Sequence, residues 1–258
     1  MASEHDTNLN GRVFGGQLLA QVLLAAQHES EGLPATLHAL FLQGAEPTQP
    51  LHYDVEILQK GRRFTSCHVR GHQFGKRVVD AQITFQQPMA GYEHAVAAPE
   101  VADPETLLPL SQLCDAQGNS LAWLAKPGLE LRLLDSPDGL AYPSAQPSLR
   151  YWVKLALPLD DQAMHYAALA YLSDYWINGA AIGHHVPLLG AREALYVASL
   201  NHSLWFHRPC VADDWILFVC DSPSLQCGRG LTWARLYDRQ RRLLASISQD
   251  ALIGPRTS

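Results

Sequence analysis

The sequence lacks the features that mark several large classes of protein. Its 19 basic residues are outnumbered by 25 acidic ones, and no basic cluster occurs, so we expect no nucleic-acid partner. No apolar run approaches the roughly 18 residues that a membrane-spanning helix needs, and the polar residues 1–9 do not resemble a signal peptide. We therefore expect no stable membrane insertion.

Cysteine is scarce and irregularly placed. The five cysteines, none of which forms a CxxC pair, are Cys67, Cys114, Cys210, Cys220 and Cys227. An odd number without regular spacing argues against a disulfide framework. We expect reduced thiols and a cytoplasmic location.

Sequence motifs of metal, phosphate and nucleotide sites are missing as well. The chain contains no HExxH, P-loop, GxGxxG or GxSxG motif. The histidines at 184–185 and at 202 and 207 invite a metal interpretation, but no Cys/His cluster accompanies them. We expect neither a metal ion nor a cofactor.

An internal repeat is the main feature that the sequence does contain. Residues 38–41 (HALF) match residues 202–205 (HSLW) at an offset of 202 − 38 = 164. Residues 79–83 (VDAQI) match residues 243–247 (LLASI) at the same offset. Repeats of this kind indicate a duplicated structural unit. We therefore predict that residues 36–87 superpose on residues 200–251, strand for strand.

The first half is predicted to be one helix followed by an antiparallel meander. An apolar stripe at helical spacing follows Gly15 and Gly16 and comprises Leu19, Val22, Leu23 and Ala26. Gly32 and Pro34 end this helix. Alternating, turn-bounded segments then predict strands at 36–45, 50–59, 64–73 and 77–87.

The second half repeats this pattern after a proline-rich segment. Residues 88–128 are expected to form a surface linker with a short helix near 105–114. Strands are expected at 130–134, 151–157, 195–208, 214–222, 228–238 and 242–253, with a helix from Asp160 or Asp161 to Asp174. This gives an α+β chain with repeats at 1–90 and 129–258, joined by the linker 91–128. We predict two tandem helix-wrapped antiparallel sheets, a double hot-dog.

Three polar residues of the second half are candidates for a site. Gln249 interrupts an otherwise apolar strand row, and an unpartnered buried amide costs about 1–3 kcal/mol, so it needs partners. Ser199 stands where the first copy has Ala35. Asp174 lies at a helix C-terminus, where the macrodipole disfavours a carboxylate. Surface aspartates and strand serines are common, but together an acid, a hydroxyl and an amide could hold and activate one water molecule.

Three longer motifs resemble the type II acyl-CoA thioesterases, a group of bacterial and peroxisomal enzymes. Residues 13–17 (VFGGQ) resemble the family's helix-opening motif, and residues 201–209 (NHSLWFHRP) are similar to its HS-W-FHRP signature. Residues 244–250 (LASISQD) resemble its closing strand, so the resemblance spans residues 12–253. It implies a double hot-dog fold and hydrolysis of acyl-CoA to free CoA and a fatty acid without a metal.

The resemblance also assigns roles to residues. The family's catalytic Asp, Thr and Gln match Asp174, Ser199 and Gln249, and Gly16 is our candidate for the oxyanion donor. Two departures stand out: Asn201 replaces the family's usual Asp, and the first repeat is expected to lack its N-terminal strand. A non-catalytic acyl-CoA binding or sensing protein on the same fold is the alternative. We further expect a homodimer or homotetramer with a place in fatty acid metabolism.

Overall fold

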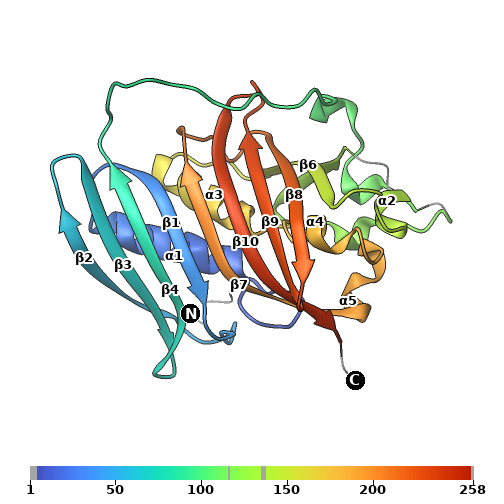
Figure 1. Cartoon of the computed structure of the whole chain (residues 1–258), viewed down its shortest axis with the longest axis horizontal. Helices are drawn as coiled ribbons and strands as arrows, with labels where there is room; N and C mark the ends of the chain where they lie inside the picture. Colours follow the sequence, from blue (N-terminus) through green and yellow to red (C-terminus); the bar gives the residue numbers. More distant parts are fainter. Residues whose placement is uncertain (1–4, 116, 135–137, 257–258) are drawn as a thin grey trace.

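Ten antiparallel strands form one continuous sheet, and both long helices lie against the same face of it (Figure 1). The computed structural model describes residues 5–115, 117–134 and 138–256. The strands are β1 Leu33–Phe41, β2 His52–Lys60, β3 Phe64–Gln73, β4 Lys76–Gln86, β5 Leu129–Leu133, β6 Ser148–Leu155, β7 Leu195–Phe206, β8 Ile216–Gln226, β9 Arg229–Tyr237 and β10 Leu243–Pro255. Their order across the sheet is β2-β3-β4-β1-β7-β10-β9-β8-β6-β5.

The two long helices begin and end as the sequence predicts. Helix α1 (Gly15–His28) buries all four residues of the predicted apolar stripe in the core. Helix α3 (Gln162–Ser173) begins at Asp161, whose carboxylate accepts the N–H of Ala163 at 3.1 Å and so satisfies one free backbone donor. Short helices α2 (Asp138–Ala141), α4 (Gly179–Ile182) and α5 (Ala191–Ala194) lie in connections that the sequence analysis left as loops or did not assign.

The expected pair of sheets is joined through the pairing of β1 with β7. The first half contributes four strands and the second six, because β5 and β6 precede α3 whereas the residues described ahead of α1 hold only an isolated bridge between Thr7 and Val13. The counterpart of β6, which pairs with β8, would lie beyond β2, and β2 is an edge strand. The first repeat thus lacks that strand among the described residues, as expected. The repeat boundaries at 90 and 128 stay a prediction.

The predicted residue offset of 164 is wrong, although β1 to β4 correspond in order to β7 to β10. Leu37 pairs with Ile83 in the first half, and His202 pairs with Gln249 in the second; all four side chains are buried. A single offset of 164 would pair His202 with Ser246, the counterparts of His38 and Gln82, but His202 pairs with Gln249. The halves differ in their turns: two residues connect β3 to β4 but five connect β9 to β10. A one-residue slip moves side chains to the opposite face of a strand.

Histidines 38 and 202 therefore do not share a structural role, contrary to the sequence alignment. His38 lies on the outer face of β1, where its Nδ1 is 2.9 Å from the Ser203 hydroxyl and its ring packs against Trp205. His202 lies on the inner face of β7 with no exposed surface. The inner face is the one that the helices cover, so only His202 is close to the candidate site.

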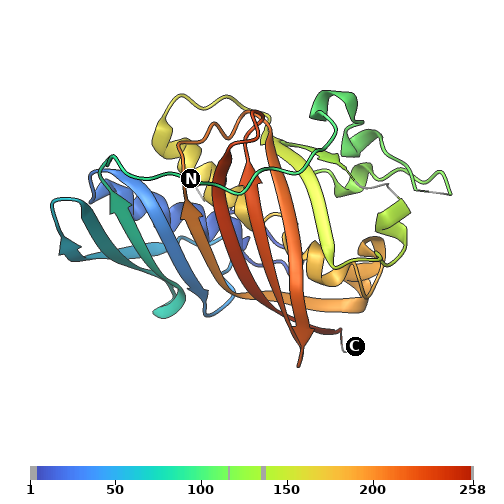
Figure 2. The same cartoon turned by 45° about the horizontal axis from the view of Figure 1, so that its top comes forward.

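The linker runs along one end of the sheet (Figure 2). Instead of a helix near 105–114 it forms separate 3-10 turns at Pro104–Thr106 and Leu110–Gln112, and a third at Ala122–Leu124. Pro109, which cannot donate a backbone hydrogen bond, interrupts a longer helix there.

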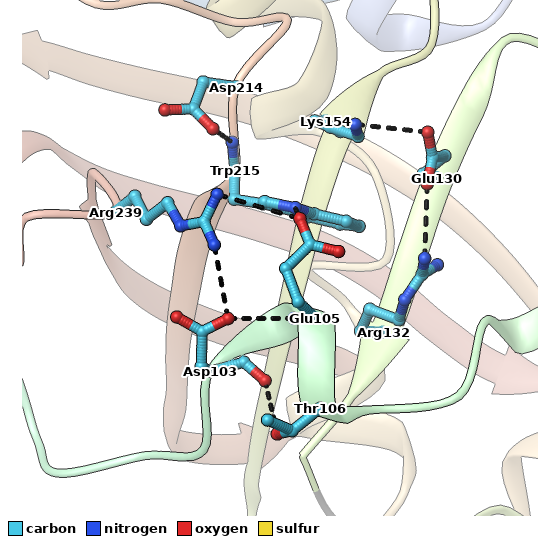
Figure 3. A network of polar contacts seen from close by, with 9 residues as sticks. All are labelled: Asp103, Glu105, Thr106, Glu130, Arg132, Lys154, Asp214, Trp215 and Arg239. Carbon is cyan, nitrogen blue, oxygen red and sulfur yellow. Dashed lines mark hydrogen bonds and ion pairs between the residues drawn. The ribbon is translucent and has the colours of Figure 1, made fainter.

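Glu105 is the centre of the linker's attachment to the second half (Figure 3). Its carboxylate accepts the Trp215 indole N–H at 2.9 Å and lies 3.7 Å from Arg239, which also contacts Asp103. The Arg132 guanidinium lies 4.9 Å from the centre of the Trp215 ring. The linker is thus an ordered part of the domain rather than a flexible tether.

All five cysteines are free in the structure, and three of them are buried. We expect that adding a reductant leaves the melting temperature unchanged, because no disulfide constrains the unfolded chain. A thermal melt followed with and without dithiothreitol measures this. A drop of many degrees in reductant would contradict the absence of a disulfide.

Candidate functional site

The candidate site forms where the start of α1 meets the end of α3. The two helices cross so closely that a β-carbon at Gly16 would lie 2.2 Å from the Tyr171 carbonyl oxygen. A β-carbon at Gly15 would lie 2.6 Å from Oδ2 of Asp174. Two consecutive glycines are therefore required for the N-terminus of α1 to reach the Asp174 carboxylate.

Asp174 is the C-terminal cap of α3, and its carboxyl group is buried. Burial raises the pKa of Asp174 to about 6, against the opposing effect of hydrogen bonds from Gln249, the Gly16 N–H and Ser199. The macrodipole of α3 disfavours the negative charge, but the N-terminus of α1 points at it and favours it. The N-terminus of α1 thus explains why a carboxylate is tolerated at the C-terminus of α3, which the stability of α3 alone does not explain.

Gln249 has the partners that its place in an apolar row requires. Its side chain has no exposed surface, and its neighbours Ile247 and Ala251 on the same face of β10 are buried as well. Its Nε2 donates to the Ser199 hydroxyl at 3.0 Å and to Oδ1 of Asn178 at 3.2 Å, while Oε1 contacts Nδ1 of His202. The amide is therefore held at both ends.

Ser199 reaches the site because β7 contains a bulge. Asn201 pairs with Asp250 and Ser199 pairs with Ala251, so Leu200 is an extra residue opposite no partner. The bulge changes the alternation and turns Ser199 to the inner face, while Asn201 faces outward beside Asp250. Regular strand alternation would put Ser199 and Asn201 on the same face, and the bulge separates them. Asn201, the departure from the family pattern, therefore has its side chain on the face opposite to Gln249.

Asn178 is a site residue that the sequence analysis missed. It follows a sharp turn after α3 in which Trp176 has φ 63°, a left-handed conformation that costs a non-glycine residue roughly 1–3 kcal/mol. The Tyr151 hydroxyl donates to the Tyr175 carbonyl and supports this turn. The turn brings Asn178 back to Gln249. No periodicity signals a residue placed in this way.

His202 was also missed as a site residue, although it lies within the motif at 201–209. Burial lowers the pKa of His202 to about 4, so the imidazole is neutral at physiological pH. Its Nε2 lies 2.8 Å from the Ser173 hydroxyl, and its Nδ1 contacts Gln249. The residue therefore joins the end of α3 to β10 behind the site.

Lys126 brings a positive charge to the site from the linker. Its ammonium group lies 4.6 Å from the Phe14 ring centre and forms an ion pair with Asp6, whose carboxylate also accepts the Tyr171 hydroxyl at 2.6 Å. The Lys126 charge contributes to lowering the pKa of Asp174, against the larger effect of burial. A cavity of about 250 Å³ adjoins Lys126 and Tyr175.

The structure brings Asp174, Ser199 and Gln249 together, as the water-activation hypothesis requires. The N–H of Gly16 donates to Asp174, so serving an oxyanion would require this donor to change partner, and that role stays a prediction. Among the described residues no group of three or more His, Cys, Asp or Glu side chains could hold a metal ion. No helix in the described part of the chain is long and apolar enough to cross a membrane.

Comparison with known proteins covers nearly the whole chain. The family model of the acyl-CoA thioesterase N-terminal domain matches residues 4–86, and that of the C-terminal domain matches residues 102–253. Acyl-coenzyme A thioesterase 8 of Mus musculus is 31% identical over 94% of this chain and 80% of its own length.

Solved structures show the same relationship. Acyl-CoA thioesterase II TesB2 from Mycobacterium marinum is 29% identical with a TM-score of 0.80, over 96% of this chain and 91% of that chain. A hot-dog protein of unknown function from Alicyclobacillus acidocaldarius, 18% identical, has a TM-score of 0.78 over 100% of this chain and 92% of its own. The second likeness concerns the fold alone, and it is the double hot-dog fold predicted from the repeat.

Proposed function

Because the chain belongs to the type II acyl-CoA thioesterase family, we propose that it hydrolyses acyl-CoA to free CoA and a fatty acid through a water molecule activated by Asp174. The observation that carries this mechanism is the convergence of a buried carboxylate, a hydroxyl and an amide at the meeting point of α1, α3, β7 and β10. The resemblance implies the same three chemical groups for the family, with the hydroxyl carried by threonine.

Asp174 acts as the general base. Its raised pKa of about 6 lies close to neutral pH, where a carboxylate is mostly ionised yet basic enough to accept a proton. Ser199 and Gln249 hold the attacking water beside it. As the water oxygen bonds to the thioester carbonyl carbon, its proton passes to Asp174. The tetrahedral intermediate then collapses, the carbon–sulfur bond breaks, and the leaving CoA sulfur receives the proton.

The test of this function is the release of free thiol from purified protein incubated with short, medium and long acyl-CoAs. Thiol release that depends on protein concentration supports hydrolysis and ranks the substrates by chain length. Saturable binding of every acyl-CoA without thiol release would instead show a non-catalytic binding protein.

Replacement of Ser199 by alanine and by threonine tests whether the hydroxyl group contributes to kcat. We expect Ser199→Ala to lower kcat roughly fivefold to tenfold, since a hydrogen bond to the water contributes about 1 kcal/mol. We expect Ser199→Thr to retain or raise kcat, because it restores the hydroxyl that the family carries on a stiffer, β-branched side chain. Steady-state kinetics on the best acyl-CoA measure both. Equal activity of the alanine variant and the wild type would remove Ser199 from the mechanism.

We also propose that the protein is a cytoplasmic homodimer or homotetramer that acts in fatty acid metabolism. The proposed location follows from the free cysteines, and the role in metabolism from the substrate class. Sedimentation velocity at several protein concentrations tests the assembly, and a monomer at all of them would contradict it.

A further inference from the structure

A buried chain of hydrogen bonds runs behind the proposed site. The Ser173 hydroxyl lies 2.8 Å from Nε2 of His202, and Nδ1 of His202 contacts Oε1 of Gln249. Ser173 and His202 have no exposed surface, so water cannot replace any of these contacts. The neutral imidazole carries one proton, which must be on one of its two nitrogens.

Two arrangements satisfy this chain. With the proton on Nδ1, His202 donates to Oε1 of Gln249, and its Nε2 accepts a hydrogen bond from the Ser173 hydroxyl. The Ser173 hydroxyl has one proton, so in this arrangement it gives up its hydrogen bond to the Ala170 carbonyl. With the proton on Nε2, His202 donates to Ser173, whose hydroxyl then points to the Ala170 carbonyl at 2.7 Å. Nδ1 is then an acceptor, so the Gln249 amide must turn over and present its oxygen to the site. The position of one proton thus decides whether Gln249 is a donor or an acceptor there.

The surroundings of Gln249 favour the first arrangement. Its NH2 group lies within hydrogen-bond distance of the Ser199 hydroxyl and of Oδ1 of Asn178. The Asp174 carboxylate is a third acceptor beside this group, and the three acceptors share its two N–H donors. A turned amide would direct its carbonyl oxygen at this buried carboxylate, which is repulsive in a medium of low dielectric constant.

We propose that His202 is a positioning residue whose proton on Nδ1 holds Gln249 with its NH2 group toward Asp174 and the reacting water. The role rests on the proposed function of Gln249. His202 itself touches neither the water nor the substrate. It acts by excluding the turned amide, so its effect is on the rate of the chemical step rather than on the binding of acyl-CoA.

The tautomer is measured directly by long-range proton–nitrogen correlation spectra of protein with ¹⁵N-labelled histidine. The His202 signals are assigned by their absence in His202→Asn. We expect a protonated Nδ1 and an unprotonated Nε2 in the wild type at pH 7. A protonated Nε2 would overturn the proposal, whatever the variants do. The tautomer is read from the intact wild-type protein, and the variant is needed only to assign the signals.

The kinetics of two His202 variants test whether His202 affects the rate of the chemical step. His202→Leu keeps the bulk but loses the donor, and we expect kcat to fall about 10- to 100-fold with KM within about twofold, as for a misplaced catalytic group. His202→Asn places an amide N–H near the position of Nδ1, and we expect it to recover most of the lost kcat. His38→Gln is the matched control, since His38 occupies the equivalent sequence motif on the outer face. Its kcat should equal that of the wild type.

The outcomes separate this proposal from the proposed function. Wild-type kcat in His202→Leu, or a rise in KM alone, would overturn the positioning role and leave Asp174 as the base. Wild-type activity in Asp174→Asn would remove the mechanism itself. Three results together support both the proposed function and the positioning role. They are an inactive Asp174→Asn variant, a protonated Nδ1 of His202 in the wild type, and recovery of kcat in His202→Asn relative to His202→Leu.

Discussion

Replacement of Asp174 by asparagine is expected to lower kcat by about 10²- to 10⁴-fold, the usual contribution of a general base. Asparagine keeps the size of the side chain but cannot accept a proton from water. Stopped or continuous thiol-release assays at saturating acyl-CoA measure the loss. A variant that retains near wild-type kcat would show that another group activates the water.

The pH dependence should identify the same residue. The raised pKa of Asp174, about 6, predicts that wild-type kcat falls as pH decreases through 6, because protonated Asp174 is no longer a base. The remaining rate of Asp174→Asn should lack this step. Ser199→Ala, which retains Asp174, serves as the control and should keep the step at a lower overall rate.

Asp174→Asn should also increase the free energy of unfolding above pH 6. Folding raises the pKa of Asp174 from 3.8 to about 6, so the folded protein binds the proton more tightly than the unfolded chain. This tighter proton binding contributes on the order of 3 kcal/mol to the free energy of unfolding. The contribution is complete below pH 3.8 and is lost as pH rises through 6. Urea unfolding at pH 4.5 and 7.5 should show the gain from Asp174→Asn increasing with pH. A gain that is independent of pH would contradict this account.

Gly16→Ala is expected to have the largest effect on stability. Its β-carbon would lie 2.2 Å from the Tyr171 carbonyl oxygen, which is backbone and can move only if α1 and α3 separate. Overpacking of this kind costs about 1–3 kcal/mol and occasionally more. We expect a clear fall in melting temperature and in kcat, since the Gly16 N–H would also move away from Asp174. Differential scanning calorimetry and thiol release measure the two effects.

Two other glycine replacements serve as comparisons for Gly16→Ala. Gly15→Ala would contact Oδ2 of Asp174, a side-chain atom that can rotate away, so we expect activity to fall more than stability. Gly190→Ala meets no atom within 4 Å and should change neither. If Gly16→Ala were as stable as Gly190→Ala, the close crossing of α1 and α3 would not be required for folding.

Local periodicity was sufficient to predict the two long helices and the strands, but not the short helices of the connections. The apolar stripe of α1 and the alternating row of β10 follow from side-chain spacing alone, which is a property of the backbone. Gln249 was recognisable because a polar residue in a buried row requires partners. Asp174 and Ser199 were weaker candidates from their positions alone, and the resemblance of the motifs to one family then assigned them catalytic roles. The repeat predicted the architecture because each copy has the same succession of helix and strands.

Only the tertiary structure decided which side chains meet. The pairing of β1 with β7 sets Ala39 opposite His202 and His38 opposite Ser203, so the two histidines lie on opposite faces although their sequence motifs match. The bulge at Leu200 separates Ser199 from Asn201. The pKa of Asp174 depends on a helix that begins at residue 15. Sequence patterns determine secondary structure because helix and strand geometry depends on residues within a few positions of one another. Burial, register and the approach of two helices depend on contacts across the whole chain, so no local pattern specifies them.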